Sequence, residues 1–341
     1  MKEKVLFSGY TKREAKGVYS AILDTEKGEF SDLELVVEVQ NPTYLDLDAK
    51  GHLYTVAMNE AGGGIGAFDF DGEKATEINL VVAEGAPLCY VGVDEVRGLV
   101  YGANYHLGQV RVYKRLENGG LELAAQVQHT GNGPHENQDK PHIHYTDLTP
   151  DNRLVVCDLG TDGVYTYDVA DNGELTLVDT YFATAGAGSR HITFHPNGKI
   201  AYLMGELNST VEVLSYDTAS GKFALLQAIT TLPETHEGFN GTAAIRLSKD
   251  GKHLYASNRG NDSLVVYNVS ENGETIEIAQ WISVEGKTPR DFNFSKSEDF
   301  VIVANQDSDN VTVFKRDKDS GLLSLVQKDF YVPEATCVLP L

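Results

Sequence analysis

The amino-acid sequence predicts an all-β fold: a seven-bladed β-propeller with four-stranded antiparallel blades, formed as one domain over residues 1–341. Three observations lead to this prediction. A phrase of strand, turn and strand recurs along the chain, its copies begin about 49 residues apart, and no segment shows sustained helical periodicity. Repeats of this length that each contain several short strands are the signature of propeller blades.

Each repeat contains a Gly-bearing turn, a strand of β-branched and aromatic residues, a tight turn and an alternating strand. The residue that ends the second strand marks each repeat, and we call it the anchor. The seven anchors are Gly9, Asn59, Asn104, Asp158, Gly205, Asn258 and Asn305. They are separated by 50, 45, 54, 47, 53 and 47 residues, so the chain divides into seven units of similar length.

The two ends of the chain fit together in the first blade. The first unit begins at its second strand, residues 5–9, and lacks an inner strand before it. Residues 333–339 resemble the inner strand that opens a repeat, such as residues 289–294. We therefore expect the C-terminal strand to complete the N-terminal blade, which would close the ring and protect its edges.

Composition narrows the functional classes. The chain has 50 acidic and 28 basic residues and a formal net charge of −22, which argues against nucleic-acid partners and anionic membrane surfaces. Its three cysteines are widely spaced and form no CxxC pair, as expected in a reducing compartment. Neither a signal-peptide pattern nor a long apolar segment is present. We expect a cytoplasmic protein, and a monomer because propellers of this type need no partner to protect their strand edges.

Two repeat positions are expected around the central channel, at the start of each inner strand and just after each anchor. The first set, aligned on the proline of each repeat, is Thr43, Leu88, His142, Arg190, Ala243, Arg290 and Glu334. The second set is Tyr10, Glu60, Tyr105, Leu159, Glu206, Arg259 and Gln306. A structural position would keep one residue type, whereas these vary, and their polar members gather in blades four to seven. This asymmetry is the main functional signal in the sequence.

The residue types indicate a site for a small anion. Arginine binds carboxylate or phosphate through two parallel hydrogen bonds. A histidine takes a proton from water, and a nearby carboxylate orients it or acts as the base itself. The catalytic hypothesis therefore rests on His142, Arg190, Glu206 and Arg259. The alternative is that these residues form ion pairs that tie neighbouring blades together.

A second group of residues is predicted to bind substrate. Arg290 and His191 occupy or adjoin the channel positions, and His144 lies two residues beyond His142 on the same strand face, as an alternative base. The anchor Asn258 and Gln306, which follows an anchor, complete the group. A metal site at His142, His144 and Asp158 is disfavoured because the spacing is not diagnostic, so we predict no metal and no cofactor.

Six segments around the candidate site form a recognisable set of motifs. They are KPHIH at 140–144, DLGTD at 158–162, SRHITFHPNG at 189–198, ELNSTV at 206–211, SNRGNDS at 257–263 and ANQDS at 304–308. Together they resemble the lactonase family of seven-bladed propellers, which includes bacterial 6-phosphogluconolactonases and fungal carboxymuconate-lactonising enzymes. The resemblance covers essentially the whole chain.

The resemblance implies metal-independent hydrolysis of 6-phosphogluconolactone, a phosphorylated sugar lactone, to 6-phosphogluconate in the pentose phosphate pathway. The family's proposed site residues fall on His142, Arg190, Glu206 and Arg259. Two departures bear on the substrate: Gly205 replaces the usual Asn before Glu206, and residues 242–244 lack the commoner acidic residue. Two other functions remain open, a cycloisomerase that lactonises a muconate-type dicarboxylate and a propeller that binds a sugar acid or a protein without catalysis.

Overall fold

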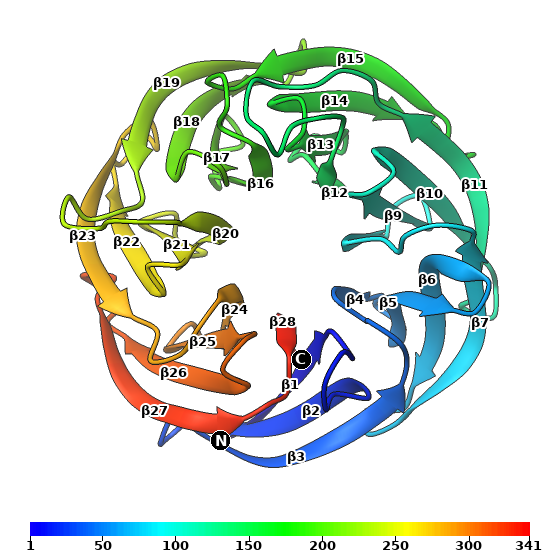
Figure 1. Ribbon diagram of the computed structural model, residues 1–341, viewed down its shortest axis with the longest axis horizontal. Coiled ribbons are helices and arrows are strands. Elements are labelled where there is room, and N and C mark those ends of the chain that lie inside the picture. The colour runs from blue at the N-terminus through cyan, green and yellow to red at the C-terminus, as the bar shows by residue number, and fades with distance from the viewer.

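Short apolar runs bounded by Gly, Asn and Asp form strands along the whole chain, and these strands assemble into a ring. The computed structural model describes residues 1–341 and confirms the predicted seven-bladed propeller: 28 strands form seven four-stranded antiparallel sheets around a central channel (Figure 1). No segment forms a helix long and apolar enough to cross a membrane.

The blades follow one another around the ring in sequence order, and only blade one joins the two ends of the chain. Blade one contains β28 (Ala335–Pro340), β1 (Lys2–Gly9), β2 (Gly17–Asp24) and β3 (Glu29–Glu38); blade two contains β4 (Leu45–Leu47), β5 (His52–Asn59), β6 (Gly62–Phe70) and β7 (Ala75–Ala83); blade three contains β8 (Tyr90–Asp94), β9 (Leu99–Asn104), β10 (Gln109–Arg115) and β11 (Leu121–Gln128). Blade four contains β12 (Ile143–Leu148), β13 (Leu154–Asp158), β14 (Gly163–Val169) and β15 (Leu175–Phe182).

The remaining three blades repeat the same order from the channel outward. Blade five contains β16 (Ser189–Phe194), β17 (Ile200–Gly205), β18 (Thr210–Asp217) and β19 (Lys222–Thr230); blade six contains β20 (Gly241–Leu247), β21 (His253–Arg259), β22 (Ser263–Val269) and β23 (Ile276–Ser283); blade seven contains β24 (Pro289–Phe294), β25 (Phe300–Asn305), β26 (Asn310–Arg316) and β27 (Leu323–Tyr331).

Burial explains why the second strand of each repeat gives the clearest pattern. Every residue of β9, β17 and β25 is buried, because neighbouring blades cover both faces of these strands. A strand covered on both faces is a continuous apolar run, whereas an outer strand such as β11 exposes most of its residues to solvent. The apolar cores accordingly lie between adjacent blades and not within one blade.

Buried tyrosines add a recurring polar contact between blades. In three blades the tyrosine of the second strand donates a hydrogen bond to a glycine carbonyl in the outer turn of the next blade, which satisfies its hydroxyl in the core. The pairs are Tyr54–Gly119 at 3.0 Å, Tyr202–Gly273 at 2.9 Å and Tyr255–Gly321 at 2.7 Å.

The ring closes as predicted, through pairing of β28 with β1. Phe7 lies opposite Val338 in this antiparallel pair, and both side chains belong to one buried apolar cluster shared by blades one and seven. Glu334 immediately precedes β28, and its carboxylate accepts hydrogen bonds from the backbone N–H groups of residues 12–15 at 2.8–3.2 Å. The C-terminal strand therefore fixes both the first blade and the loop between β1 and β2.

We predict that Val338→Asp in β28 destabilises the whole propeller. Val338 is 1% exposed, so the substitution would bury an unpaired charge at the closure, at a cost of about 3 kcal/mol or more. The matched control is Leu325→Asp in the outer strand β27, where the side chain is 44% exposed and a change within about 0.5 kcal/mol is expected. Thermal unfolding followed by circular dichroism measures both. Equal melting temperatures for the two variants would contradict closure through β28.

Candidate active site

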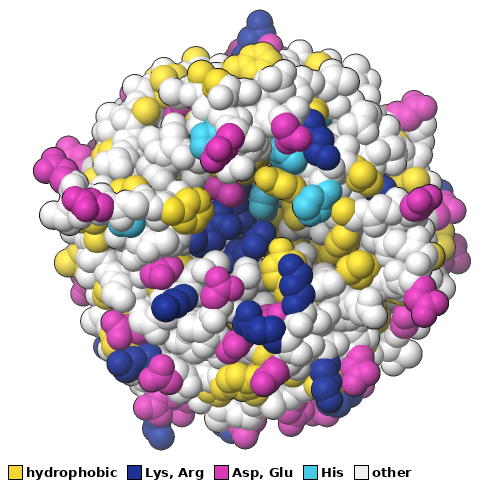
Figure 2. Space-filling model, viewed as in Figure 1, with side chains coloured by type: hydrophobic (Ala, Val, Ile, Leu, Met, Phe, Trp, Pro, Cys, Tyr) yellow, Lys and Arg dark blue, Asp and Glu magenta, His cyan; other side chains and the backbone are white.

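The central channel contains a cavity of about 420 Å³ that residues from all seven blades line. Figure 2 shows Lys and Arg side chains gathered in the central hollow with histidines beside them. The lining cations are Lys12, Arg190, Arg259 and Arg290, and the lining acids are Glu206 and Asp291, so the cavity carries a net charge of +2 with neutral histidines. In a protein of net charge −22 this concentrates positive charge at one point.

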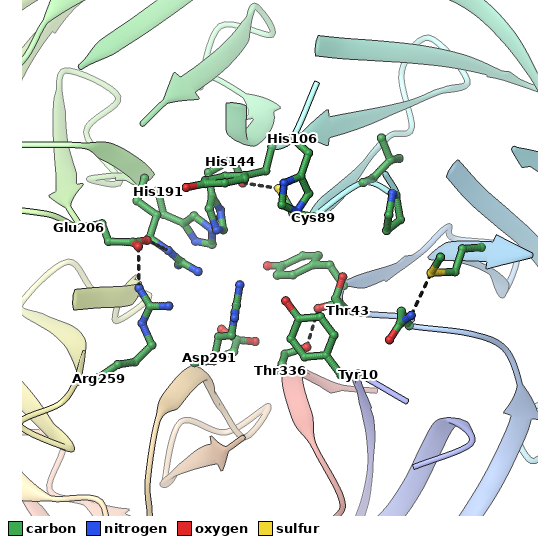
Figure 3. A pocket seen from close by; sticks show the side chains of 18 of the residues that line it. Tyr10, Thr43, Cys89, His106, His144, His191, Glu206, Arg259, Asp291 and Thr336 are labelled. Atoms are coloured by element: carbon green, nitrogen blue, oxygen red, sulfur yellow. Dashed lines mark hydrogen bonds and ion pairs between the residues drawn. The ribbon is translucent and has the colours of Figure 1, made fainter. Parts of the chain in front are cut away.

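A carboxylate holds two of the arginines in place. Glu206 follows β17, and its Oε2 lies 2.7 Å from Nε of Arg190 while its Oε1 lies 3.0 Å from Nη2 of Arg259. Figure 3 shows Glu206 and Arg259 joined at one side of the cavity. The pair between Glu206 and Arg259 also ties blade five to blade six, so this ion pair has the structural role that the sequence left open.

Backbone carbonyls complete the fixation of both guanidinium groups. Nη1 of Arg190 donates to the carbonyl of Ala243 at 2.6 Å, and Arg259 donates to the carbonyls of Gly241 and Thr242. Within the protein, Nη2 of Arg190 and Nη1 of Arg259 have no acceptor. Each arginine thus keeps one N–H₂ group available to a ligand.

The protonation of this bridge follows from burial and charge. Burial lowers the pKa of Arg190 to about 10, and repulsion from Arg259 and Arg290 contributes, so the guanidinium is still charged at neutral pH. Burial alone would raise the pKa of Glu206, but Arg259, Arg190 and Arg290 outweigh it and lower that pKa below its ordinary value. Glu206 is therefore an ionised carboxylate whose two oxygens are both occupied.

Two neutral histidines lie next to the arginines. Nδ1 of His144 is 3.2 Å from Nε2 of His191, and both side chains line the cavity. Burial lowers both pKa values well below 6.5, and the positive charge of Arg190 lowers them further. Nε2 of His144 has no partner in the protein and is not enclosed by protein atoms. His144 consequently offers an unprotonated ring nitrogen, or its N–H, to a ligand.

The structure does not place His142, the predicted catalytic histidine, among the residues that line the cavity. Its ring stacks on Tyr105 with centroids 4.4 Å apart. Nδ1 lies 3.0 Å from the carbonyl of Tyr105, and Nε2 lies 2.9 Å from Oδ1 of Asp139. Both ring nitrogens are thus occupied. Asp158 binds the backbone of His142 and the ring of His129.

A two-residue error in alignment explains this difference. The residue opposite the anchor is Ile143 in blade four and Pro289 in blade seven, and the next residue, His144 or Arg290, lines the cavity. Alignment on prolines fails in blade four because Pro141 lies two residues before Ile143. Counting back from the anchor would have selected His144.

The same error affects blade one. Ala335 pairs with the anchor Gly9, and the next residue, Thr336, lines the cavity in place of the expected Glu334. Breaks in strand register also bring consecutive side chains into the cavity. The pairing of β16 with β17 shifts between Ser189 and Ile192, so both Arg190 and His191 line it.

The other predicted residues divide into two groups. Arg290 lines the cavity, and its Nη1 donates a hydrogen bond to Oε1 of Gln306 at 3.2 Å. Gln306 does not line the cavity itself and contacts the site only through Arg290. Asn258 is fully buried and binds Thr231 and Ser263, which gives it a structural role in blade six.

Sequence reasoning missed Lys12, Cys89 and Asp291. Lys12 and Cys89 lie outside the two repeat positions used to choose residues, whereas Asp291 follows the selected Arg290 directly. Burial raises the pKa of the Cys89 thiol to about 12. The thiol that lines the cavity is therefore protonated at neutral pH. No group of three or more His, Cys, Asp or Glu side chains is arranged to hold a metal ion.

Comparisons with known proteins agree with this architecture. The family described as "Lactonase, 7-bladed beta-propeller" matches residues 4–340. The chain is 63% identical to the uncharacterized protein YwcC of Lactococcus lactis over 341 residues, covering all of both chains. It is 38% identical to the 6-phosphogluconolactonase of Bacillus subtilis over 334 residues, covering 96% of this chain and 95% of the other.

A solved structure extends the comparison to a second lactone. The periplasmic gluconolactonase of Pseudomonas aeruginosa superimposes with a TM-score of 0.94 at 28% identity, covering 100% of this chain and 99% of the other. The match over nearly the whole sequence, together with the seven closed blades and their channel cavity, shows that this chain belongs to the lactonase family of seven-bladed β-propellers.

Proposed function

We propose that the protein hydrolyses 6-phosphogluconolactone to 6-phosphogluconate in the central cavity. The observation that carries this proposal is the convergence of three arginines, one lysine and a neutral histidine pair on one cavity of about 420 Å³. A sugar lactone is small enough for this volume, and its phosphate complements the net positive charge. Membership of the lactonase family and a relative named for this reaction support the choice.

In this proposal His144 is the general base. We assign the proton between the two rings to Nδ1 of His144, 3.2 Å from Nε2 of His191, so that Nε2 of His144 keeps a lone pair for the cavity that this residue lines. That nitrogen takes a proton from water as the water oxygen bonds to the lactone carbonyl carbon. When the tetrahedral intermediate collapses, the bond from carbon to ring oxygen breaks and His144 returns the proton to the leaving oxygen.

Arg190 and Arg259 would stabilise the charge that develops on the carbonyl oxygen. Each has one N–H₂ group without a protein acceptor, and Glu206 holds both guanidinium groups before the substrate arrives. Donors fixed in advance stabilise an oxyanion without reorganising during the reaction. Glu206 is thus a positioning residue, and its paired oxygens and lowered pKa make it a weaker base than a free carboxylate.

The proposed reaction needs no cofactor and yields the 6-phosphogluconate of the pentose phosphate pathway. The three cysteines are free thiols, which supports a cytoplasmic location. We propose that the protein acts there as a monomer, because the closed ring already pairs the strands that face the channel.

We predict opposite outcomes for two histidines that lie two residues apart. His144→Gln should lower kcat by about 10²–10⁴, the range for loss of a general base, whereas His142→Gln should leave kcat close to wild type. Lactone opening is measured by proton release in weak buffer, with the spontaneous rate subtracted. Loss of activity in His142→Gln alone would contradict the assignment of the base.

The same assay tests the reaction itself. Wild-type protein that adds nothing to the spontaneous rate would contradict hydrolysis, and lactone formation from a muconate-type dicarboxylate would favour the cycloisomerase.

A second prediction concerns the charge of His144. Because burial and the neighbouring arginines lower its pKa, the ring should stay neutral at pH 6.5 and become protonated only at lower pH. Arg290→Met removes one of the positive charges that oppose protonation, so the pKa should rise in that variant. An NMR titration of the imidazole resonances measures this, with His144→Gln identifying the signal. A wild-type midpoint at or above 6.5 would contradict the assigned environment.

A further inference from the structure

The cations of the cavity form two groups with different partners. Arg190 and Arg259 share the carboxylate of Glu206. Lys12 and Arg290 instead flank the ring of Tyr10: Nζ of Lys12 lies 4.1 Å and Cζ of Arg290 lies 5.5 Å from its centroid. Figure 3 shows Tyr10 across the cavity from Glu206 and Arg259.

The group at Tyr10 has no carboxylate of its own. Lys12 and Arg290 take part in no ion pair, and the only side-chain hydrogen bond of Arg290 is to the neutral amide of Gln306. Asp291 adjoins Arg290 in sequence, but its Oδ1 pairs with Arg246 at 2.9 Å and its Oδ2 accepts the backbone N–H of Val338. Neither of the two positive charges at this side of the cavity is therefore in direct contact with a carboxylate of the protein.

The loop that carries Tyr10 and Lys12 is held in place from a distant part of the sequence. The carboxylate of Glu334, which is 2% exposed, accepts the four backbone N–H groups of residues 12–15. Thr11 and Asn41 exchange two further hydrogen bonds, each from a backbone N–H to the other side chain. This anchoring fixes the backbone of Lys12 at the cavity rim and thereby keeps its ammonium group within reach of the cavity.

We propose that Lys12, Arg290 and the face of Tyr10 form a subsite that binds the terminal phosphate of the lactone, with the lactone ring directed toward His144. This inference rests on the proposed hydrolysis and determines which lactone the protein prefers. A phosphate offers several acceptor oxygens to the guanidinium and ammonium groups, whereas the hydroxymethyl group of an unphosphorylated lactone leaves both cations unpaired. The subsite thus selects phosphorylated over neutral sugar lactones.

The test compares two substrates and two lysines of the same loop. Lys12→Met should lower the ratio of kcat/KM for 6-phosphogluconolactone to kcat/KM for glucono-1,5-lactone by about 10- to 100-fold, as expected for one charge-assisted contact. Arg290→Met should lower the ratio at least as much. Lys16→Met removes the same charge from an exposed position that does not line the cavity, and its ratio should match wild type. An unchanged ratio in Lys12→Met, or an equal fall in Lys16→Met, would overturn the proposal.

Binding measurements separate this inference from the proposed hydrolysis. Calorimetry compares 6-phosphogluconate with gluconate, which differ only in the phosphate. Wild type should bind the phosphorylated acid at least about 10-fold more tightly, and Lys12→Met should lose most of this preference. Absence of hydrolysis with the preference intact would contradict the proposed function and leave the subsite standing. Hydrolysis in wild type with the same phosphate preference in Lys12→Met would overturn the subsite alone.

Glu334 provides a third variant that tests the loop. Glu334→Gln should weaken its hydrogen bonds to residues 12–15 and lower the selectivity ratio in the same direction as Lys12→Met. A residue that only stabilised the fold would lower kcat/KM for both lactones by the same factor and leave the ratio unchanged. That outcome would show that Glu334 does not position Lys12 for the phosphate.

Discussion

Pairing of the last strand with the first is the contact on which the cavity depends. β28 joins β1 in blade one, and it also contacts both neighbouring blades: the backbone N–H of Val338 donates to Asp291, and Thr336 donates to the carbonyl of Thr43. The cavity receives side chains from Tyr10 at one end of the chain to Thr336 at the other. These residues meet only when the ring is closed, so folding and the assembly of the site are one event.

Closing the ring brings three arginines together in one cavity, and ion pairing within the protein offsets only part of their positive charge. Buried arginines lose hydration, which lowers the pKa of Arg190 to about 10 but leaves it charged at neutral pH. Glu206 offsets one charge and orients two guanidinium groups, while the histidine pair stays neutral. Lys12 and Arg290, which line the cavity and form no ion pair, then favour an anionic ligand. The net charge of −22 belongs to the whole chain, whereas the cavity gathers four cationic side chains at one point, which suits a small anion.

The fold and much of the cavity could be predicted from the sequence because equivalent residues of the repeats occupy equivalent positions in their blades. Arg190, Glu206, Arg259 and Arg290 occur at repeat positions next to strongly apolar strands, and the structure brings all of them together. Pro141 and Pro289 look equivalent in the sequence, which points to His142, but strand pairing places these prolines two residues apart in the repeat.

Other parts of the site could not be predicted because they depend on contacts between remote segments. Lys12 lies in a loop between two strands, and nothing in its own repeat shows that this loop turns toward the channel. Its position is set by Glu334, 322 residues later in the chain. The positions of the two histidines likewise depend on strand register, which places His144 in the cavity lining and leaves His142 outside it.

A crystal structure with 6-phosphogluconate bound tests the central claim most directly, because the product carries both anionic ends of the proposed reaction. The account predicts that the phosphate contacts Lys12 and Arg290 beside Tyr10, and that the carboxylate lies at Arg190 and Arg259 within reach of Nε2 of His144. A phosphate bound at Arg190 and Arg259, or a ligand bound outside the channel cavity, would contradict it.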